Sequence, residues 1–156
     1  DRAHHVDTKI RPALERGEIV ITDRYLDSSI AYQGAGRVLS PGEVGRISRW
    51  ATESLIPTLT IIIDLPAEVG IGRLKSRDRL ESESIAFHER VRQEFLSLSL
   101  LDPERYIVID GRQSIEDIHV AITSRVMELR DLSKIEKKPK TKKRIIKKPN
   151  LRKSSK

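Results

Sequence analysis

Three short runs of apolar, mostly β-branched residues constrain the fold of this chain most strongly. They lie at residues 19–21, 59–65 and 106–109. Polar residues hardly alternate with apolar ones in these runs, which is typical of strands covered on both faces in a parallel sheet. The second and third runs carry aspartates near their ends, Asp64 and Asp110. Polar residues just past strand ends are where open α/β sheets bind ligands.

Helical patterns separate the three runs. Gly17 follows the first pattern as a C-terminal stop, and Pro12 is expected to kink that helix. Ser40 and Ser114 are expected N-cap residues, the latter with Asp117 at the third helical position. The alternation of helices and strands predicts an α/β fold with a doubly wound parallel sheet. The helical patterns cover about residues 3–16, 41–55, 67–74, 84–101 and 115–129.

The start of the chain suggests that further strands precede it. The sequence begins without methionine and inside a helical pattern, which we interpret as a truncation, although processing would give the same start. An open sheet of only three parallel strands would also leave two long edges, which proteins normally avoid. We therefore expect a missing N-terminal part to supply more strands.

Composition excludes several classes of protein. The 156 residues include no cysteine, which excludes disulfides and thiolate metal sites. A cytoplasmic location fits this composition. No apolar run approaches the roughly 20 residues that span a bilayer, so we expect no membrane segment. The four histidines form no metal-binding pattern; they are His4, His5, His88 and His119.

The positive charge is concentrated at the C-terminal end. Residues 133–156 contain 12 Lys and Arg and one acidic residue, whereas the rest of the chain has 18 basic and 22 acidic residues. Such a tail has few apolar groups to bury and repels itself. We therefore predict an α/β domain at 1–131 and a disordered basic tail at 132–156. The tail offers weak, non-specific nucleic-acid binding as an alternative function, but it has no aromatic residue for base stacking.

The segment at residues 23–33 has the richest chemistry. It directly follows the first predicted strand, so Asp23 and Arg24 would emerge at that strand's carboxyl end. An arginine there can bind phosphate in bidentate fashion, and an aspartate beside it can order magnesium-bound water or hold the arginine in place. The pattern alone fits equally well a structural Asp23–Arg24 ion pair and a core position for Tyr32. Side chains that can read a base or sugar follow on Ser28, Ser29, Tyr32 and Gln33.

This segment resembles the signature of the thymidylate kinase family. Eight of its eleven positions match the form expected in bacterial members. The resemblance extends over about residues 1–129 and includes further matches in the right order, at 11–14, 34–37, 57–59, 68–70, 77–81 and 114–117. It implies the P-loop NTPase-like fold of nucleoside monophosphate kinases, a three-layer parallel sheet with flanking helices, here without the N-terminal strand and P-loop.

The resemblance also implies an activity and roles for individual residues. The family phosphorylates dTMP to dTDP with ATP and Mg²⁺, for dTTP synthesis. By this resemblance Arg24 grips the dTMP phosphate, Ser29 hydrogen-bonds the thymine edge, Tyr32 lies beside the sugar and favours deoxyribose, and Gln33 supports the pocket. Arg2 reaches the thymine base from the preceding helix; on its own it also fits a solvated helix residue.

Two further groups are implied to serve the phosphates. Asp23 lies near the phosphates and magnesium, through metal-bound water. A charged run after residue 72 resembles the lid over ATP, in which Arg77 and Arg79 are the first candidates for catalytic arginines and Arg73 the second. Taken alone, such a run is more often a solvated helix end.

The chain contains no Gly-x-x-x-x-Gly-Lys-Ser/Thr motif. The resemblance places this ATP-binding loop upstream of Asp1, so we expect no useful turnover by the chain alone. A deoxynucleoside kinase is the nearest rival within the kinases, but Tyr25 and residues 31–33 argue against it. The family is commonly dimeric, and residues 41–56 are the candidate interface.

Overall fold

The computed structural model describes residues 2–36, 41–73 and 82–136, with backbone only at 35–36, 41 and 132–136. The predicted N-cap Ser40, the lid arginines Arg77 and Arg79, and tail residues 137–156 lie outside this part. In chain order the elements are α1 (Arg2–His5), the π-helical turn η1 (Val6–Ile10), α2 (Arg11–Glu15), α3 (Leu26–Gly36), α4 (Pro41–Ala51), β1 (Thr60–Asp64), α5 (Ala67–Gly72), α6 (Ile85–Leu101), β2 (Tyr106–Asp110) and α7 (Ile115–Glu136).

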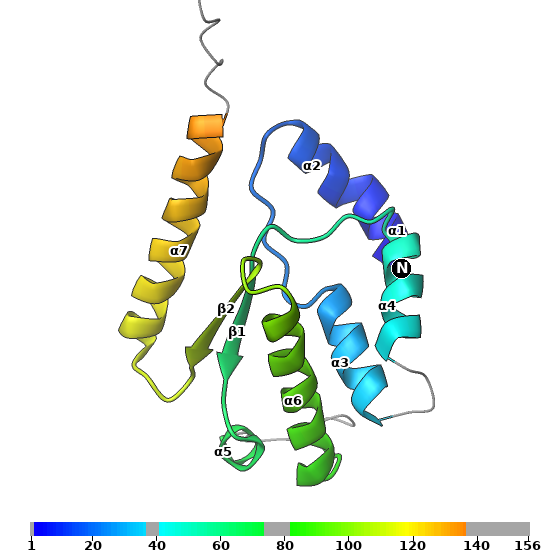
Figure 1. Cartoon of the computed structure of the whole chain (residues 1–156), viewed down its shortest axis with the longest axis vertical. Helices are drawn as coiled ribbons and strands as arrows, with labels where there is room; N and C mark the ends of the chain where they lie inside the picture. The colour runs from blue at the N-terminus through cyan, green and yellow to red at the C-terminus, as the bar shows by residue number, and fades with distance from the viewer. Residues whose placement is uncertain (1, 37–40, 74–81, 137–156) are drawn as a thin grey trace, which may run out of the picture.

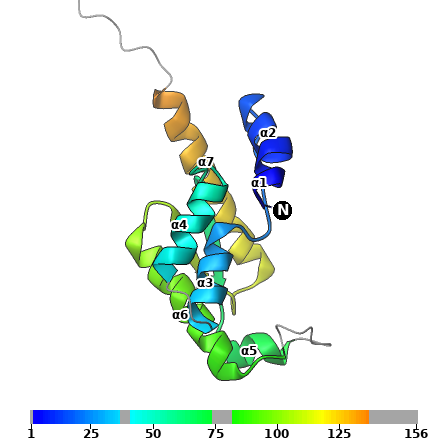
Figure 2. The ribbon, with the colours of Figure 1, turned by 90° about the vertical axis from the view of Figure 1, so that its right-hand side faces the viewer.

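The two strands form a parallel pair, as predicted for covered β-branched runs. The register runs from Thr60 opposite Tyr106 to Asp64 opposite Asp110, so both aspartates lie at the same edge. Helix α7 lies on one side of the strands, and α3, α4 and α6 lie on the other (Figure 1). Helices α2 and α5 lie at opposite ends of the long axis (Figure 2). The described part of the chain is thus an α/β unit with a small parallel sheet.

The predicted strand at residues 19–21 is wrong. This segment has no regular structure, and Ile19 and Ile21 are 78% and 92% exposed. A strand is held by hydrogen bonds to a neighbour, and within the described residues β1 pairs only with β2. In a three-residue run without such a partner, the backbone N–H and C=O groups hydrogen-bond to water, and the β propensity of the side chains is not enough to form a strand.

The N-terminal helix forms with the irregularity that Pro12 demands. Proline lacks a backbone N–H and cannot donate a hydrogen bond to the carbonyl four residues earlier in a helix. The turn before it widens into the π-helical η1, and Pro12 lies in the first turn of α2. Gly17 has φ +80° and donates its N–H to the Leu14 carbonyl at 2.9 Å, which confirms the predicted stop.

Serine side chains cap the two helices around β2. Ser84 Oγ accepts the Phe87 N–H at the start of α6. Ser114 Oγ accepts the Asp117 N–H at 3.0 Å and donates to Asp117 Oδ2 at 2.7 Å, as the sequence predicted. Helix α7 continues to Glu136, past the predicted boundary at residues 131–132. Within the described residues, no helix is long and apolar enough to cross a membrane.

Replacing Ser114 with alanine is expected to destabilise the chain by about 1 kcal/mol, because the first turn of α7 loses its capping acceptor. Urea unfolding measures this change. Ser124→Ala is the matched control, since Ser124 is exposed inside α7 and alanine is the better helix former there. Equal stability of the two variants would contradict the capping role.

The core places α3 between two other helices. Leu26 and Ile30 of α3 form a buried cluster with Val44 of α4, and Tyr25 and Leu98 pack against it. Burial of this kind contributes about 1.5–3 kcal/mol for each large side chain. Helix α3 carries most of the segment with the richest chemistry, so this cluster fixes its position.

Candidate functional site

Arg24 precedes α3 in a backbone conformation that is uncommon for arginine. Its φ is +60°, in the left-handed region that disfavours side chains with a Cβ. Its carbonyl accepts the Thr22 hydroxyl at 3.0 Å. The guanidinium lies 5.1 Å from the centre of the Tyr32 ring. Asp23 is exposed, and no ion pair joins it to Arg24 among the described residues, so the simple structural pair is not observed.

Arg2 reaches from α1 onto α3. Its Nη2 donates to Ser29 Oγ at 2.7 Å and to the Tyr25 carbonyl at 3.3 Å. The guanidinium also lies 5.7 Å from the Tyr25 ring. Arg2 and Ser29 are 27 positions apart in sequence, so the fold brings together two residues that sequence analysis predicted for one site.

Tyr32 is held by the aromatic residues of α6. It is half-buried, and its ring centre lies 6.3 Å from that of Phe87 and 6.4 Å from that of Phe95. Gln33, the next residue on α3, is exposed. The predicted residues Arg24, Ser29, Tyr32 and Gln33 thus lie in or just before α3, with Arg2 against it.

The position of this group corrects one expectation. Asp23 and Arg24 were expected at the carboxyl end of a strand over residues 19–21. Instead Asp27, in the first turn of α3, pairs with Arg105 directly before β2 and hydrogen-bonds Thr60 at the start of β1. The start of α3 therefore lies at the amino ends of the strands, because this pair holds it there and no paired strand leads into it.

The carboxyl ends of the strands carry a second charged group. Arg92 of α6 binds Asp64 in bidentate fashion, with Nε–Oδ1 2.7 Å and Nη2–Oδ2 2.9 Å. Hydrogen bonds from Arg92 lower the pKa of Asp64, against a smaller opposing effect of burial. Asp110 binds Arg112, whose hydrogen bonds lower the pKa of this half-exposed carboxyl to about 2. No sequence pattern singled out Arg92.

The predicted lid arginine Arg73 reaches the same edge. Its Nη1 donates to the Gly111 carbonyl at 3.2 Å, and the Gly111 N–H donates to the Asp64 carbonyl at 2.8 Å. Arg73 therefore lies beside the strand ends, where it hydrogen-bonds the backbone.

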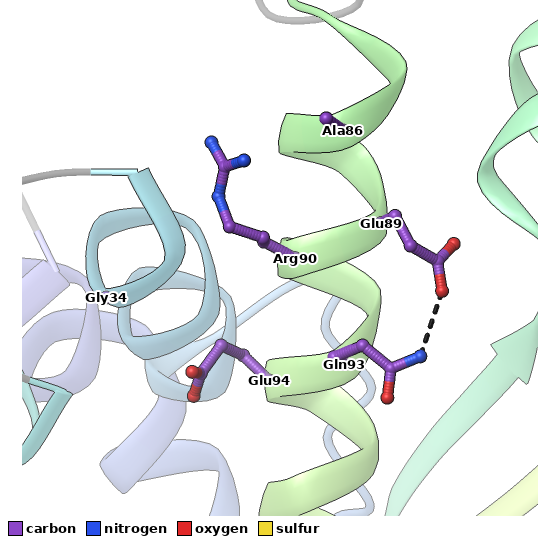
Figure 3. Close-up of a pocket in the computed structure, with 6 residues that line it drawn as sticks. All are labelled: Gly34, Ala86, Glu89, Arg90, Gln93 and Glu94. Atoms are coloured by element: carbon purple, nitrogen blue, oxygen red, sulfur yellow. Dashed lines mark hydrogen bonds between the residues drawn. The ribbon is translucent and has the colours of Figure 1, made fainter.

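A cavity of about 500 Å³ lies between α3 and α6. Figure 3 shows Arg90 and Glu94 extending from α6 on the side of Gly34, while Glu89 accepts a hydrogen bond from Gln93 at 2.9 Å. The lining carries charges of both signs. No group of three or more potential metal ligands occurs in the described segments of the chain.

The Asp64–Arg92 pair is expected to make stability depend on pH. The folded pKa of Asp64 is lowered from its ordinary value of 3.8, so its contribution is present above that pH and is lost as pH falls below it. Asp64→Asn should cost about 2 kcal/mol at pH 7. In urea unfolding at pH 7 and pH 3, the difference between wild type and variant should shrink at pH 3. A difference that stays constant would contradict this role.

The sequence of this chain matches those of known thymidylate kinases. The thymidylate kinase family model matches residues 1–122. The thymidylate kinase of Clavibacter michiganensis subsp. michiganensis is 53% identical over 133 residues, covering 83% of this chain and 63% of that protein. That of Cutibacterium acnes is 49% identical over 129 residues, with the same shares covered. The chain thus spans less than two thirds of the length of these relatives.

A solved structure shares the fold. The crystal structure of thymidylate kinase from Ehrlichia chaffeensis matches with a TM-score of 0.53 and 31% identity, over 69% of this chain and 51% of the other. With a family model that covers more than half of its residues, the chain belongs to the thymidylate kinase family.

Proposed function

We propose that this chain supplies the dTMP-binding part of an enzyme that transfers a phosphoryl group from ATP to dTMP. The observation that carries the proposal is the Arg2–Ser29 hydrogen bond of 2.7 Å. It joins two helices at residues that can both read a nucleobase, next to the arginine that precedes α3. The complete fold is inferred to be the three-layer P-loop NTPase sheet of the nucleoside monophosphate kinases.

The chemistry of α3 suits a nucleoside monophosphate. The Arg24 guanidinium rests over the Tyr32 ring, which leaves its in-plane N–H groups free to bind a phosphate in bidentate fashion. Tyr32 would then lie beside the sugar, with Gln33 supporting the pocket. Arg2 and Ser29 would bind the thymine through hydrogen bonds. Such bonds select one base over another, because a base that cannot make them leaves polar groups of the site buried and unpaired.

The strand ends suit the donor side. The carboxyl edge of a parallel sheet is the usual place for a nucleotide, and Arg73 lies there. Arg77 and Arg79, outside the described residues, would stabilise charge on the transferring phosphoryl group. Asp23 lies at the amino ends of the strands instead. Its exposed carboxylate has the oxygen donors that Mg²⁺ prefers, and its proposed role through metal-bound water requires that the complete sheet bring it to the donor side. The magnesium would neutralise phosphate charge when bound with ATP.

Two parts of the proposal concern other molecules. The chain has no P-loop motif, so phosphoryl transfer is proposed to need a phosphate cradle that these residues do not include. Helix α4 is proposed as part of a homodimer interface, because Ile47 and Trp50 are 56% and 82% exposed and line a surface hollow with Arg46.

Calorimetric titration of the full chain with dTMP, dUMP, AMP and thymidine tests the binding proposal. We expect dTMP to bind more tightly than the other three. A parallel turnover assay with dTMP and Mg-ATP should give no useful rate. Equal affinity for dTMP and AMP would contradict the assignment of the base, and turnover by the chain alone would contradict the need for an added cradle.

A further inference from the structure

A buried ion pair ties the first turn of α3 to the sheet. Arg105 Nη1 donates to Asp27 Oδ2 at 2.9 Å, and Nη2 donates to Oδ1 at 3.2 Å. The two side chains are only 14% and 6% exposed. Thr60 hydrogen-bonds Oδ2 at 3.3 Å, and the guanidinium stacks 4.2 Å from the Tyr106 ring centre. This geometry is bidentate and shielded from water, so it constrains position as well as charge.

The residues between this pair and Arg24 are anchored as well. The Tyr25 hydroxyl donates to the Leu55 carbonyl at 3.1 Å, and Leu26 is 2% exposed in the core cluster. Arg24 itself holds a left-handed φ of +60°. Such a conformation costs about 1–3 kcal/mol and persists only where the surroundings determine it. The contacts of Tyr25 and Leu26 fix the backbone that follows Arg24 and so hold it in this conformation.

We propose that Arg105 is a positioning residue, which through Asp27 fixes the start of α3 and so aims Arg24 at the phosphate of dTMP. The inference rests on the proposed function and deepens it. The base and sugar contacts depend on Arg105 much less. Arg2 reaches Ser29 from α1, and Tyr32 is held by Phe87 and Phe95 of α6. Weakening the pair should therefore loosen the grip on phosphate selectively.

The test is Arg105→Lys in the full chain, with dTMP and thymidine titrated separately. Lysine keeps the charge but loses the planar bidentate fork. We expect the dissociation constant for dTMP to rise about tenfold and that for thymidine by less than about twofold. Asp27→Glu, which displaces the same carboxylate, should show the same selectivity. Ile122→Ala on α7 is the control, because it lowers stability away from α3 and should leave the ratio unchanged.

Amide hydrogen exchange gives a readout that needs no ligand. In Arg105→Lys, exchange at residues 24–29 should accelerate more than exchange in α7. If the wild-type chain binds no dTMP, the proposed function fails, and the exchange pattern alone decides whether Arg105 fixes this segment. Equal losses for dTMP and thymidine, or acceleration spread evenly over the chain, would overturn the inference.

Discussion

Replacing Arg105 with methionine is expected to lower the free energy of unfolding by about 3–5 kcal/mol. The variant leaves the Asp27 carboxylate, whose residue is 4% exposed, buried without its cation. Burial by itself lowers the pKa of Arg105, but the hydrogen bonds and charge of Asp27 outweigh that effect and raise it. The pair is held by two hydrogen bonds in a buried site, so removing one partner costs more than the pair itself contributes.

Urea unfolding of three variants separates these effects. The double variant Asp27→Leu/Arg105→Met should recover most of the loss, because it removes the unpaired charge together with its partner. Arg125→Met is the matched control, because its partners Glu104 and Glu128 are well exposed, and it should cost less than about 1 kcal/mol. A loss below about 1 kcal/mol for Arg105→Met itself would show that water or another group satisfies Asp27.

Replacing Arg24 with alanine is expected to weaken dTMP binding about 100-fold. Two charge-assisted hydrogen bonds to phosphate are lost, each worth about 1.5–3 kcal/mol. Water that hydrogen-bonds the phosphate in place of Arg24 offsets part of this loss. Thymidine, which has no phosphate, should bind almost as well as before. The dTMP affinity of Arg24→Lys should lie between those of the wild type and Arg24→Ala, because lysine keeps the charge without the planar fork.

Titration calorimetry with both ligands checks this prediction. Arg16→Ala is the control, since Arg16 is exposed and pairs with Glu18 at the end of α2. It should leave both affinities unchanged. If Arg24→Ala weakened thymidine as much as dTMP, Arg24 would be serving the shape of the pocket, through its contact with Tyr32, and not the phosphate.

The sequence predicts some elements well because their cause is local. The runs predicted at 59–65 and 106–109 correspond to β1 (Thr60–Asp64) and β2 (Tyr106–Asp110), which pair with each other. Residues 19–21 have the same composition, but a strand also needs a neighbour, and local composition does not supply one. The cap at Ser114 depends on Asp117, three positions away, so it can be predicted from spacing.

The candidate site was predictable only in part. The roles of Arg24 and Ser29 came from family resemblance, and the structure adds the contact with Arg2. Arg92 and Arg105 gave no sequence signal, because their partners are 28 and 78 positions away. Arginines are common on helices and in loops, and only the tertiary fold shows which ones are paired with a buried or half-buried carboxylate.

The left-handed backbone at Arg24 has a consequence for how this chain would change under selection. Glycine relieves the strain at such a position, and asparagine tolerates it better than most residues do. In a library randomised at this codon, sorting for folded protein alone should enrich glycine and asparagine. Sorting the same library for retention on immobilised dTMP should enrich arginine. The residue type at position 24 would then show whether a related protein still binds the phosphate of dTMP.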